Sequence, residues 1–297
     1  YRDPVSGDFV LPWVYLHALK DYSDMAAHLE RHPRIHSIIN FVPVLLDQIA
    51  DYCAQFDDGQ FRDPLLRLLA LPDHDQINQA DRKLLLDTCF RCNHATMLAP
   101  FPHYKRLFEL HSVAKREGVG GPEYFSGQYF ADLVTWYHLT WCGESVRIAS
   151  TLPAKLMRKG ESFTAADRQE LLALIGSVIR GLIPRYRNLC ATRQIELSTT
   201  PGTHPLGPLL IDFGTARESE PHAPLPLSSG YPGGRERMQS QIADALAMHT
   251  RHFGAAPTGV WPAEGAISTA LVKLLADNGC RWLASGERVL RNSLTES

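Results

Sequence analysis

The sequence predicts an α/β fold built on a parallel sheet or barrel, and three observations support this class. Apolar runs with strand character alternate with amphipathic helical segments, which is typical of βα units rather than of a β-sandwich. With 297 residues and 44% hydrophobic content, the chain can bury a large core in one big domain. The strand expected at 35–42 leads directly into Pro43, a residue suited to the first turn of a helix.

The remaining elements follow in order along the chain. We expect one catalytic domain over residues 1–297, interrupted by a helical insertion at 55–140 that is rich in periodic leucines. A helix opened by a capping segment at Thr164 leads to the next strand. After the insertion the predicted elements are a helix at 164–189, a strand at 194–198, a loop at 223–234, a helix at 239–252, a strand at 257–261, a helix at 268–278 and a strand at 280–284.

Composition limits the classes of partner. Thirty Lys and Arg residues against 32 Asp and Glu give a net charge of −2, which offers no electrostatic footprint for nucleic acid and fits a neutral substrate. The longest apolar run, 38–50, is broken by polar residues, so we expect a soluble chain with no membrane partner and, by default, a cytoplasmic location. We expect the six cysteines to be reduced, and we expect no cofactor and no metal.

The most informative motif is the segment 259–265, Gly-Val-Trp-Pro-Ala-Glu-Gly, which follows a predicted strand. Glycosidic bond cleavage with retention needs two carboxyl groups, one as the nucleophile and one as the acid/base. An indole is also a natural platform for a sugar ring. We therefore take Glu264 as the candidate nucleophile and Trp261 as a candidate substrate-binding residue. Taken alone, an exposed acid is most often simply solvated, and a Trp most often belongs to a core.

Glu196 and His204 mark a second candidate region. Glu196 lies between Ile195 and Leu197, and this alternation turns its side chain away from both apolar neighbours, toward the lumen or mouth of a barrel. The strand then opens into polar residues and turn formers that reach His204, as expected where barrel strands enter functional loops. A simple ion-pair role for Glu196 stays open.

These motifs resemble glycoside hydrolase family 57. Residues 194–201 (Gln-Ile-Glu-Leu-Ser-Thr-Thr-Pro), with His204-Pro205 and Pro208-Leu209-Leu210, resemble the second conserved region of the family, and 259–265 resembles the third. Tyr1-Arg2-Asp3-Pro4 with Leu11-Pro12-Trp13 resembles the segment after the family's His-Gln-Pro motif, and Tyr231-Pro232-Gly233-Gly234 resembles one of its loops. The resemblance covers nearly the whole chain and is weakest in the helical insertion.

The resemblance implies an incomplete (β/α)7 barrel and a retaining α-glycoside hydrolase or transglycosidase that acts on α-glucans. It implies that Glu264 forms the glycosyl-enzyme intermediate. Glu196, Trp261, His204 and Trp13 are implied as substrate-binding residues, with an α-glucan or oligosaccharide as the partner.

Two departures from the family pattern concern the ends of the chain. The first strand with its His-Gln-Pro motif would precede Tyr1, so we expect a trimmed amino terminus. The acid/base aspartate of the family is expected beyond Ser297, because neither Asp277 nor Glu287 stands in its place. By this expectation the 297-residue form is itself inactive.

Two alternatives remain open. His28, His32 and His36 repeat every four residues, as in a metal site on one helix, and would fit a metal-dependent polysaccharide deacetylase with a similar barrel. Pro33, however, should end the helix near His32 and separate His36 from it. The second alternative is a non-catalytic carbohydrate-binding descendant of the same barrel.

Overall fold

The computed structural model describes residues 2–3, 5–118, 121–228, 230–287, 289 and 291. The chain divides into two compact units, Tyr1–Arg31 with Ile49–Pro184 and His32–Gln48 with Arg185–Ser297. Of the opening segment 1–4 compared with family 57, Tyr1 and Pro4 lie outside the described residues. The predicted α/β class is confirmed, because a parallel sheet is combined with a majority of helical residues. The incomplete (β/α)7 barrel stays a prediction.

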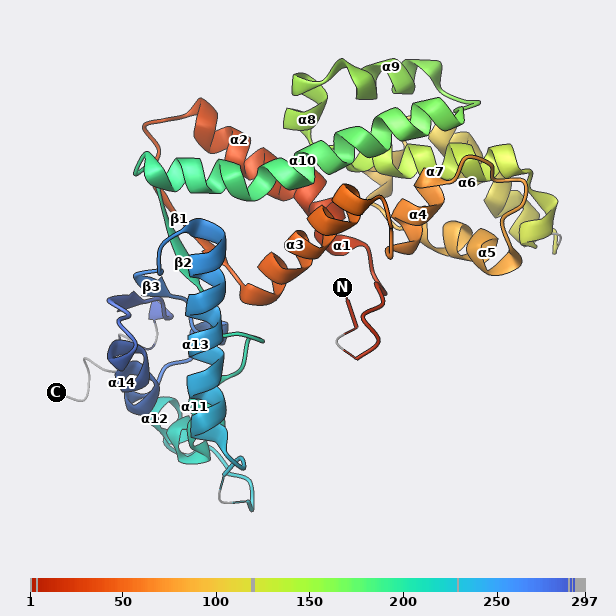
Figure 1. Ribbon diagram of the computed structural model, residues 1–297. Helices are drawn as coiled ribbons and strands as arrows, with labels where there is room; N and C mark the ends of the chain where they lie inside the picture. Colours follow the sequence, from red (N-terminus) through yellow and green to blue (C-terminus); the bar gives the residue numbers. More distant parts are fainter. Residues whose placement is uncertain are drawn as a thin grey trace. The chain divides into compact units, whose positions relative to one another are not determined.

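The first unit is helical throughout its described elements (Figure 1). Its α-helices are α1 (Trp13–His17), α2 (Ser23–Arg31), most of α3 (Pro43–Asp58), α4 (Pro64–Ala70), α5 (Gln79–Thr88), α6 (Pro102–Arg116), α7 (Gly127–Trp141), α8 (Glu144–Ala149), α9 (Thr151–Lys159) and most of α10 (Ala165–Ala191). Two π-helical turns, η1 (Ala18–Tyr22) and η2 (His94–Leu98), and a 3-10 turn, η3 (Pro122–Tyr124), complete it. Predicted residues 55–140 contain helices and no strand among those described, and the single domain with an insertion stays a prediction.

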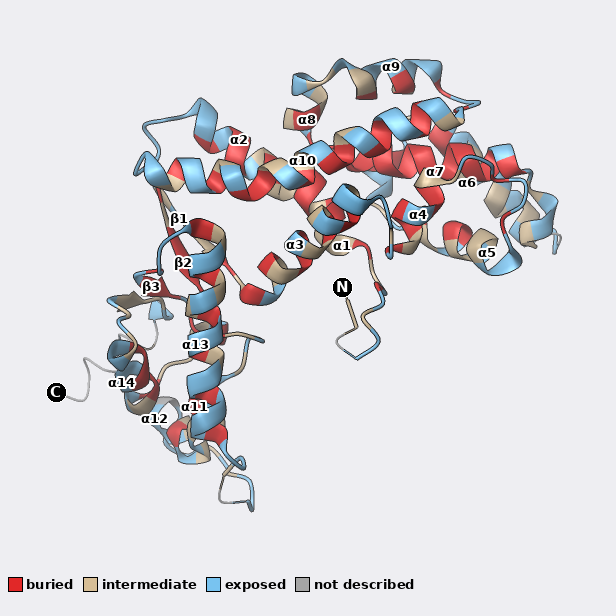
Figure 2. Cartoon of the chain, in the orientation of Figure 1, coloured by how far each residue is buried: buried red, intermediate tan, exposed pale blue. Residues whose placement is uncertain are grey.

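Helix α7 forms the centre of this unit. Almost every residue of α7 is buried, as Figure 2 shows by its nearly continuous red. Several polar groups of its buried side chains have hydrogen-bond partners. The Trp136 indole donates to the Gly160 carbonyl at 2.7 Å, and His138 lies between the Tyr15 hydroxyl at 2.9 Å and the Val134 carbonyl. Such bonds stabilise a helix that is buried on all sides, because an unpaired buried group costs free energy.

The second unit contains the sheet. Strands β1 (Ser37–Phe41), β2 (Ile195–Thr199), β3 (Gly259–Val260) and β4 (Trp282–Leu283) are parallel and lie in that order among the described residues. Its helices are α11 (Gly207–Ile211), α12 (Ala216–Ser219), α13 (Gly234–Phe253) and α14 (Thr269–Asp277), with 3-10 turns η4 (Phe213–Thr215) and η5 (Ala263–Gly265). Consecutive strands are joined through helical connections, the arrangement that the sequence predicts.

One face of the sheet packs on α13 and α14, which Figure 1 draws in blue beside the strands. The core residues of this face are Met238, Ile242, Val260, Leu271, Leu274 and Leu275. In β2, Ile195 and Leu197 are buried while Glu196 is half-buried, so the predicted alternation is confirmed. The opposite face carries polar groups, with Ser198 Oγ donating to Asn40 Oδ1 and Asn40 Nδ2 donating to Thr200 Oγ1, each at 3.0 Å.

Predicted and observed boundaries differ in an instructive way. The capping segment at Thr164 is confirmed, since Thr164 and Asp167 exchange side-chain-to-backbone hydrogen bonds before α10. The expected strand at 257–261 has only two strand residues, because Trp261 already belongs to the loop. The helix expected at 239–252 begins earlier, at Gly234, and the short helix α11 was not expected.

The six cysteines are free, and no described helix is long and apolar enough to cross a bilayer.

Candidate active site

The loop after β3 is bonded to the end of β2. The Trp261 amide donates to the Thr199 carbonyl at 2.8 Å, and the Thr200 hydroxyl donates to the Trp261 carbonyl at 2.9 Å. Both bonds use the main chain of Trp261, so its indole is not needed for them. The side chain is accordingly free to face solvent, and the residue is 51% exposed. An exposed indole beside a strand end is available to a ligand.

Glu264 sits on a strained turn at the carboxyl end of β3. It lies in the 3-10 turn Ala263–Gly265 with φ 56° and ψ 15°, a left-handed conformation that is unfavourable for a residue with a side chain. The turn is held from outside, because the Ser285 hydroxyl donates to the Gly265 carbonyl at 2.7 Å. The Glu264 side chain is 76% exposed, which leaves its carboxylate open to a ligand.

His204 reaches the same point from the end of β2. Its Nε2 lies 3.5 Å from Glu264 Oε1, within ion-pair distance when the imidazole is protonated. His204 also has a left-handed backbone, with φ 63°. Its loop is fastened to α13 by Gln241, whose side-chain oxygen accepts from the Thr203 amide at 2.6 Å and whose carbonyl accepts from the Gly202 amide.

The pairing of these two residues is the most distinctive feature of the site. Among the described residues, four non-glycine residues have a positive φ, and two of these, His204 and Glu264, bring their side chains together. Backbone strain of this kind is retained where surrounding structure enforces it, and it concentrates at functional sites. The sequence singled out both residues, but nothing in it indicated their backbone conformation.

Glu196 lies elsewhere on the sheet. It precedes Thr199 by three residues, and Thr199 pairs with Val260 at the end of β3, so Glu196 stands about 10 Å nearer the amino ends of the strands. Its Oε1 accepts hydrogen bonds from the Trp282 indole at 2.6 Å and from the Thr258 hydroxyl. The described structure records no hydrogen bond or ion pair between Glu196 and either His204 or Glu264.

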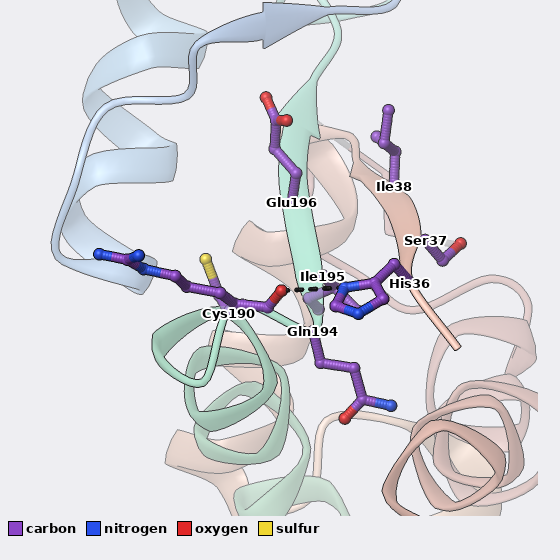
Figure 3. A pocket seen from close by; sticks show the side chains of 8 residues that line it. His36, Ser37, Ile38, Cys190, Gln194, Ile195 and Glu196 are labelled. Atoms are coloured by element: carbon purple, nitrogen blue, oxygen red, sulfur yellow. Dashed lines mark hydrogen bonds between the residues drawn. The ribbon is translucent and has the colours of Figure 1, made fainter. Parts of the chain in front are cut away.

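An open cavity of about 620 Å³ lies beside Glu196 (Figure 3). Figure 3 shows Glu196 projecting from β2 above Gln194 and His36, whose ring nitrogen Nδ1 lies 3.2 Å from the Arg193 carbonyl. The lining residues are His36, Ser37, Ile38, Cys190, Arg193, Gln194, Ile195 and Glu196. Neither Glu264 nor His204 lines this cavity, so the two carboxylates face different surroundings.

Trp13, the remaining candidate, belongs to the first unit, whereas the other four belong to the second. It begins α1 and packs against Trp141, with ring centroids 6.0 Å apart, and against His17 at 6.4 Å. Trp13 is half-buried, so part of its ring remains exposed.

The histidine repeat is divided as its proline predicts. His28 lies in α2, which ends at Arg31, and His32 and His36 follow beyond it. No group of three His, Cys, Asp or Glu side chains that could hold a metal ion occurs in the part of the chain that the structure describes.

The sequence analysis did not identify Trp282 and Thr258 as hydrogen-bond donors to Glu196. It also did not predict that the Trp282 ring lies close to Gly259. Trp282 falls in the predicted strand 280–284, but its contact with Glu196 depends on the order of the strands. The glycine that opens the candidate motif was the one available signal, because a glycine in a strand often marks a close approach.

In the comparison with protein families, the model of glycosyl hydrolase family 57 matches residues 1–296. Comparison with curated proteins gives no match. Among solved structures, a family 57-type branching enzyme of the archaeon Pyrococcus horikoshii is 14% identical, with a TM-score of 0.39, covering 91% of this chain and 36% of its own.

Two further structures resemble the chain to the same degree. A branching enzyme of Thermococcus kodakaraensis is 14% identical, with a TM-score of 0.38, covering 91% of this chain and 34% of its own. An α-amylase of Thermotoga maritima is 12% identical, with a TM-score of 0.41, covering 95% and 36%. The chain thus spans about a third of the length of these structures. TM-scores this low do not establish a shared architecture.

Proposed function

The chain belongs to glycosyl hydrolase family 57, and we propose from this that it carries the nucleophile of a retaining enzyme acting on α-linked glucans. The proposal assigns the nucleophile to Glu264. The observation that carries it is the approach of His204 Nε2 to within 3.5 Å of Glu264 Oε1, on two strained turns at the carboxyl ends of neighbouring strands.

In the proposed reaction, the ionised Glu264 attacks the anomeric carbon and forms a glycosyl ester while an acid protonates the leaving oxygen. Water then releases the sugar in hydrolysis, or a sugar hydroxyl releases it in transfer. The acid must stand about 5 to 5.5 Å from the nucleophile. Asp277 and Glu287 are not proposed for this role, because they form exposed ion pairs with Lys273 at 3.3 Å and Arg291 at 2.8 Å.

The proposed part of His204 is to orient the nucleophile. A hydrogen bond or ion pair on Oε1 leaves Oε2 as the attacking oxygen. The exposed ring of Trp261, three residues before Glu264, is the proposed platform for the sugar at the cleavage point.

Glu196 and Trp13 are proposed as substrate contacts and not as catalytic groups. Glu196 borders the cavity of about 620 Å³, a volume sufficient for a sugar ring, and a carboxylate is a strong acceptor for sugar hydroxyls. Trp13 keeps part of its ring exposed in the first unit. The proposed partner is therefore a neutral α-glucan, which suits a net charge of −2.

The test compares the full-length protein with its Glu264→Gln variant on a panel of α-glucan oligosaccharides, measuring released and transferred sugar. We expect kcat to fall roughly 10³-fold or more, because the amide cannot form the ester. Glu236→Gln is the matched control, an exposed glutamate in the first turn of α13, and should retain full activity.

Unchanged turnover by Glu264→Gln would exclude Glu264 as the nucleophile. If the unmodified protein binds the oligosaccharides without cleaving or transferring them, the non-catalytic carbohydrate-binding alternative replaces the proposal.

A further inference from the structure

The Trp282 side chain crosses a whole strand to reach Glu196. In the order β1-β2-β3-β4, Trp282 on β4 is separated from Glu196 on β2 by β3. Its indole Nε1 nevertheless donates to Glu196 Oε1 at 2.6 Å. The ring must therefore lie flat over β3, on the face of the sheet opposite the core residue Val260.

Gly259 is the point at which the indole crosses. Gly259 pairs directly with Trp282, and a Cβ placed on Gly259 would stand 1.9 Å from both Cε2 and Cζ2 of the indole ring. Nothing about the backbone demands glycine here, since Gly259 is not among the residues with positive φ. The glycine is therefore required for space, and any side chain at position 259 would displace the ring.

A second donor fixes the same oxygen. The Thr258 hydroxyl, adjacent to Gly259, also donates to Glu196 Oε1. Oε2 accepts no hydrogen bond from the part of the chain that the structure describes, while the residue as a whole lines the cavity. Two donors on one oxygen leave the other as the acceptor available to a ligand.

We propose that Trp282 is a positioning residue: its indole, admitted by Gly259 and assisted by Thr258, orients the Glu196 carboxylate so that Oε2 accepts a hydrogen bond from a glucan hydroxyl. This inference rests on the proposed function. The proposed role of Trp282 explains why the 259–265 motif opens with a glycine. It also adds Trp282, which lies outside that motif, to the residues that support substrate binding.

The contact itself is tested without any sugar. The protein has five tryptophans, so the indole N–H signals in a proton–nitrogen correlation spectrum can be assigned by single Trp→Phe variants. We expect Glu196→Ala to shift the Trp282 signal strongly and to leave the Trp136 signal, whose donor bond goes to the Gly160 carbonyl, in place. A Trp282 signal that does not respond to Glu196→Ala overturns the proposal.

The positioning role is tested by binding of maltoheptaose to the full-length protein. Trp282→Phe keeps an aromatic side chain and removes the indole donor, and we expect it to weaken affinity roughly tenfold, as loss of a hydrogen bond to a charged group would. In a Glu196→Gln background the same substitution should have little further effect, because the group it orients is already altered. Equal losses in both backgrounds would show that Trp282 acts independently of Glu196 and would overturn the proposal.

Gly259→Ala supplies the third comparison. It should displace the indole and reproduce the loss of affinity seen in Trp282→Phe, with KM raised more than kcat is lowered. Thr258→Val, which removes the second donor to Glu196 Oε1, should also weaken affinity, and Thr250→Val, which removes an exposed hydroxyl that bonds only within α13, is its control. If the Trp282 signal responds as expected but no glucan binds the unmodified protein, the contact stands and the proposed function fails. If glucan binds and Gly259→Ala leaves its affinity unchanged, the positioning role fails alone.

Discussion

Two buried polar residues of the first unit contrast with the candidate site of the second unit. In the first unit, Arg168 is 3% exposed and donates to the carbonyls of Phe163, Leu71 and Pro72, and His138 is fully buried. In the second unit, Glu264 lies on an exposed and strained turn beside His204. Buried and satisfied groups stabilise a fold, whereas exposed groups on enforced backbone are available for chemistry. Under the proposed function, the first unit is a scaffold and the second unit carries the reacting groups.

The comparison predicts the largest effect on stability in the first unit. Arg168→Ala removes three hydrogen bonds from a charged donor, and we expect the free energy of unfolding to fall by roughly 3 to 5 kcal/mol. Urea unfolding measures this loss, and kcat per folded molecule should not change.

The control for Arg168 lies on the same helix. Arg180 forms an exposed ion pair with Asp57 at 3.3 Å, and Arg180→Ala should cost less than about 1 kcal/mol. Equal losses from the two substitutions would break the contrast between enclosed and exposed polar groups.

A change in pH is expected to have an effect of intermediate size on the free energy of unfolding. Burial lowers the pKa of His138 to about 4, well below the ordinary histidine value of 6.5. Between these values the unfolded chain binds a proton that the folded chain does not, so stability is complete above pH 6.5 and is lost as pH falls toward 4. The loss attributable to His138 is on the order of 3 kcal/mol.

Unfolding free energies at several pH values measure this effect. Burial also lowers the pKa of His74 to about 4, so both histidines contribute in the same window. His138→Gln should flatten the pH dependence, whereas His222→Gln, at an exposed position of the second unit, should leave it intact. An unchanged slope in His138→Gln would contradict the prediction.

The smallest predicted effect is an increase, and not a decrease, in the free energy of unfolding. Glu264→Gly removes the penalty of a left-handed conformation, so we expect it to stabilise the protein by about 1 kcal/mol while abolishing activity. Thermal unfolding measures the gain. Ser162, in the first unit, has nearly the same φ of 58° and an exposed side chain, and Ser162→Gly should give a similar gain with activity unchanged. A destabilised Glu264→Gly would show that the turn is not strained.

Sequence reasoning succeeded where the determinants are local. Alternation around Glu196, the reciprocal cap at Thr164 and the proline that opens α3 each depend on a few adjacent residues. It failed where the determinant is the order of the strands. Strand β3 lies between Trp282 and Glu196, and the indole can reach Glu196 only because β3 carries a glycine at the crossing point.

The candidate site shows the same division. Glu264, Trp261 and His204 were found from residue type and motif, and His204 and Glu264 do meet. Their left-handed backbones could not be predicted, because conformations of this kind are imposed by the contacts of the surrounding loops.

The attachment of the loop at Trp261 has a consequence for how this chain can change. The loop is bonded to β2 through the amide and the carbonyl of Trp261, and neither bond involves the indole. The fold therefore places no demand on the identity of the side chain at that position. Under the proposed function, substitution at this exposed position changes the platform for the sugar without refolding the loop that holds Glu264, so selection can explore new substrates while the proposed nucleophile stays in place.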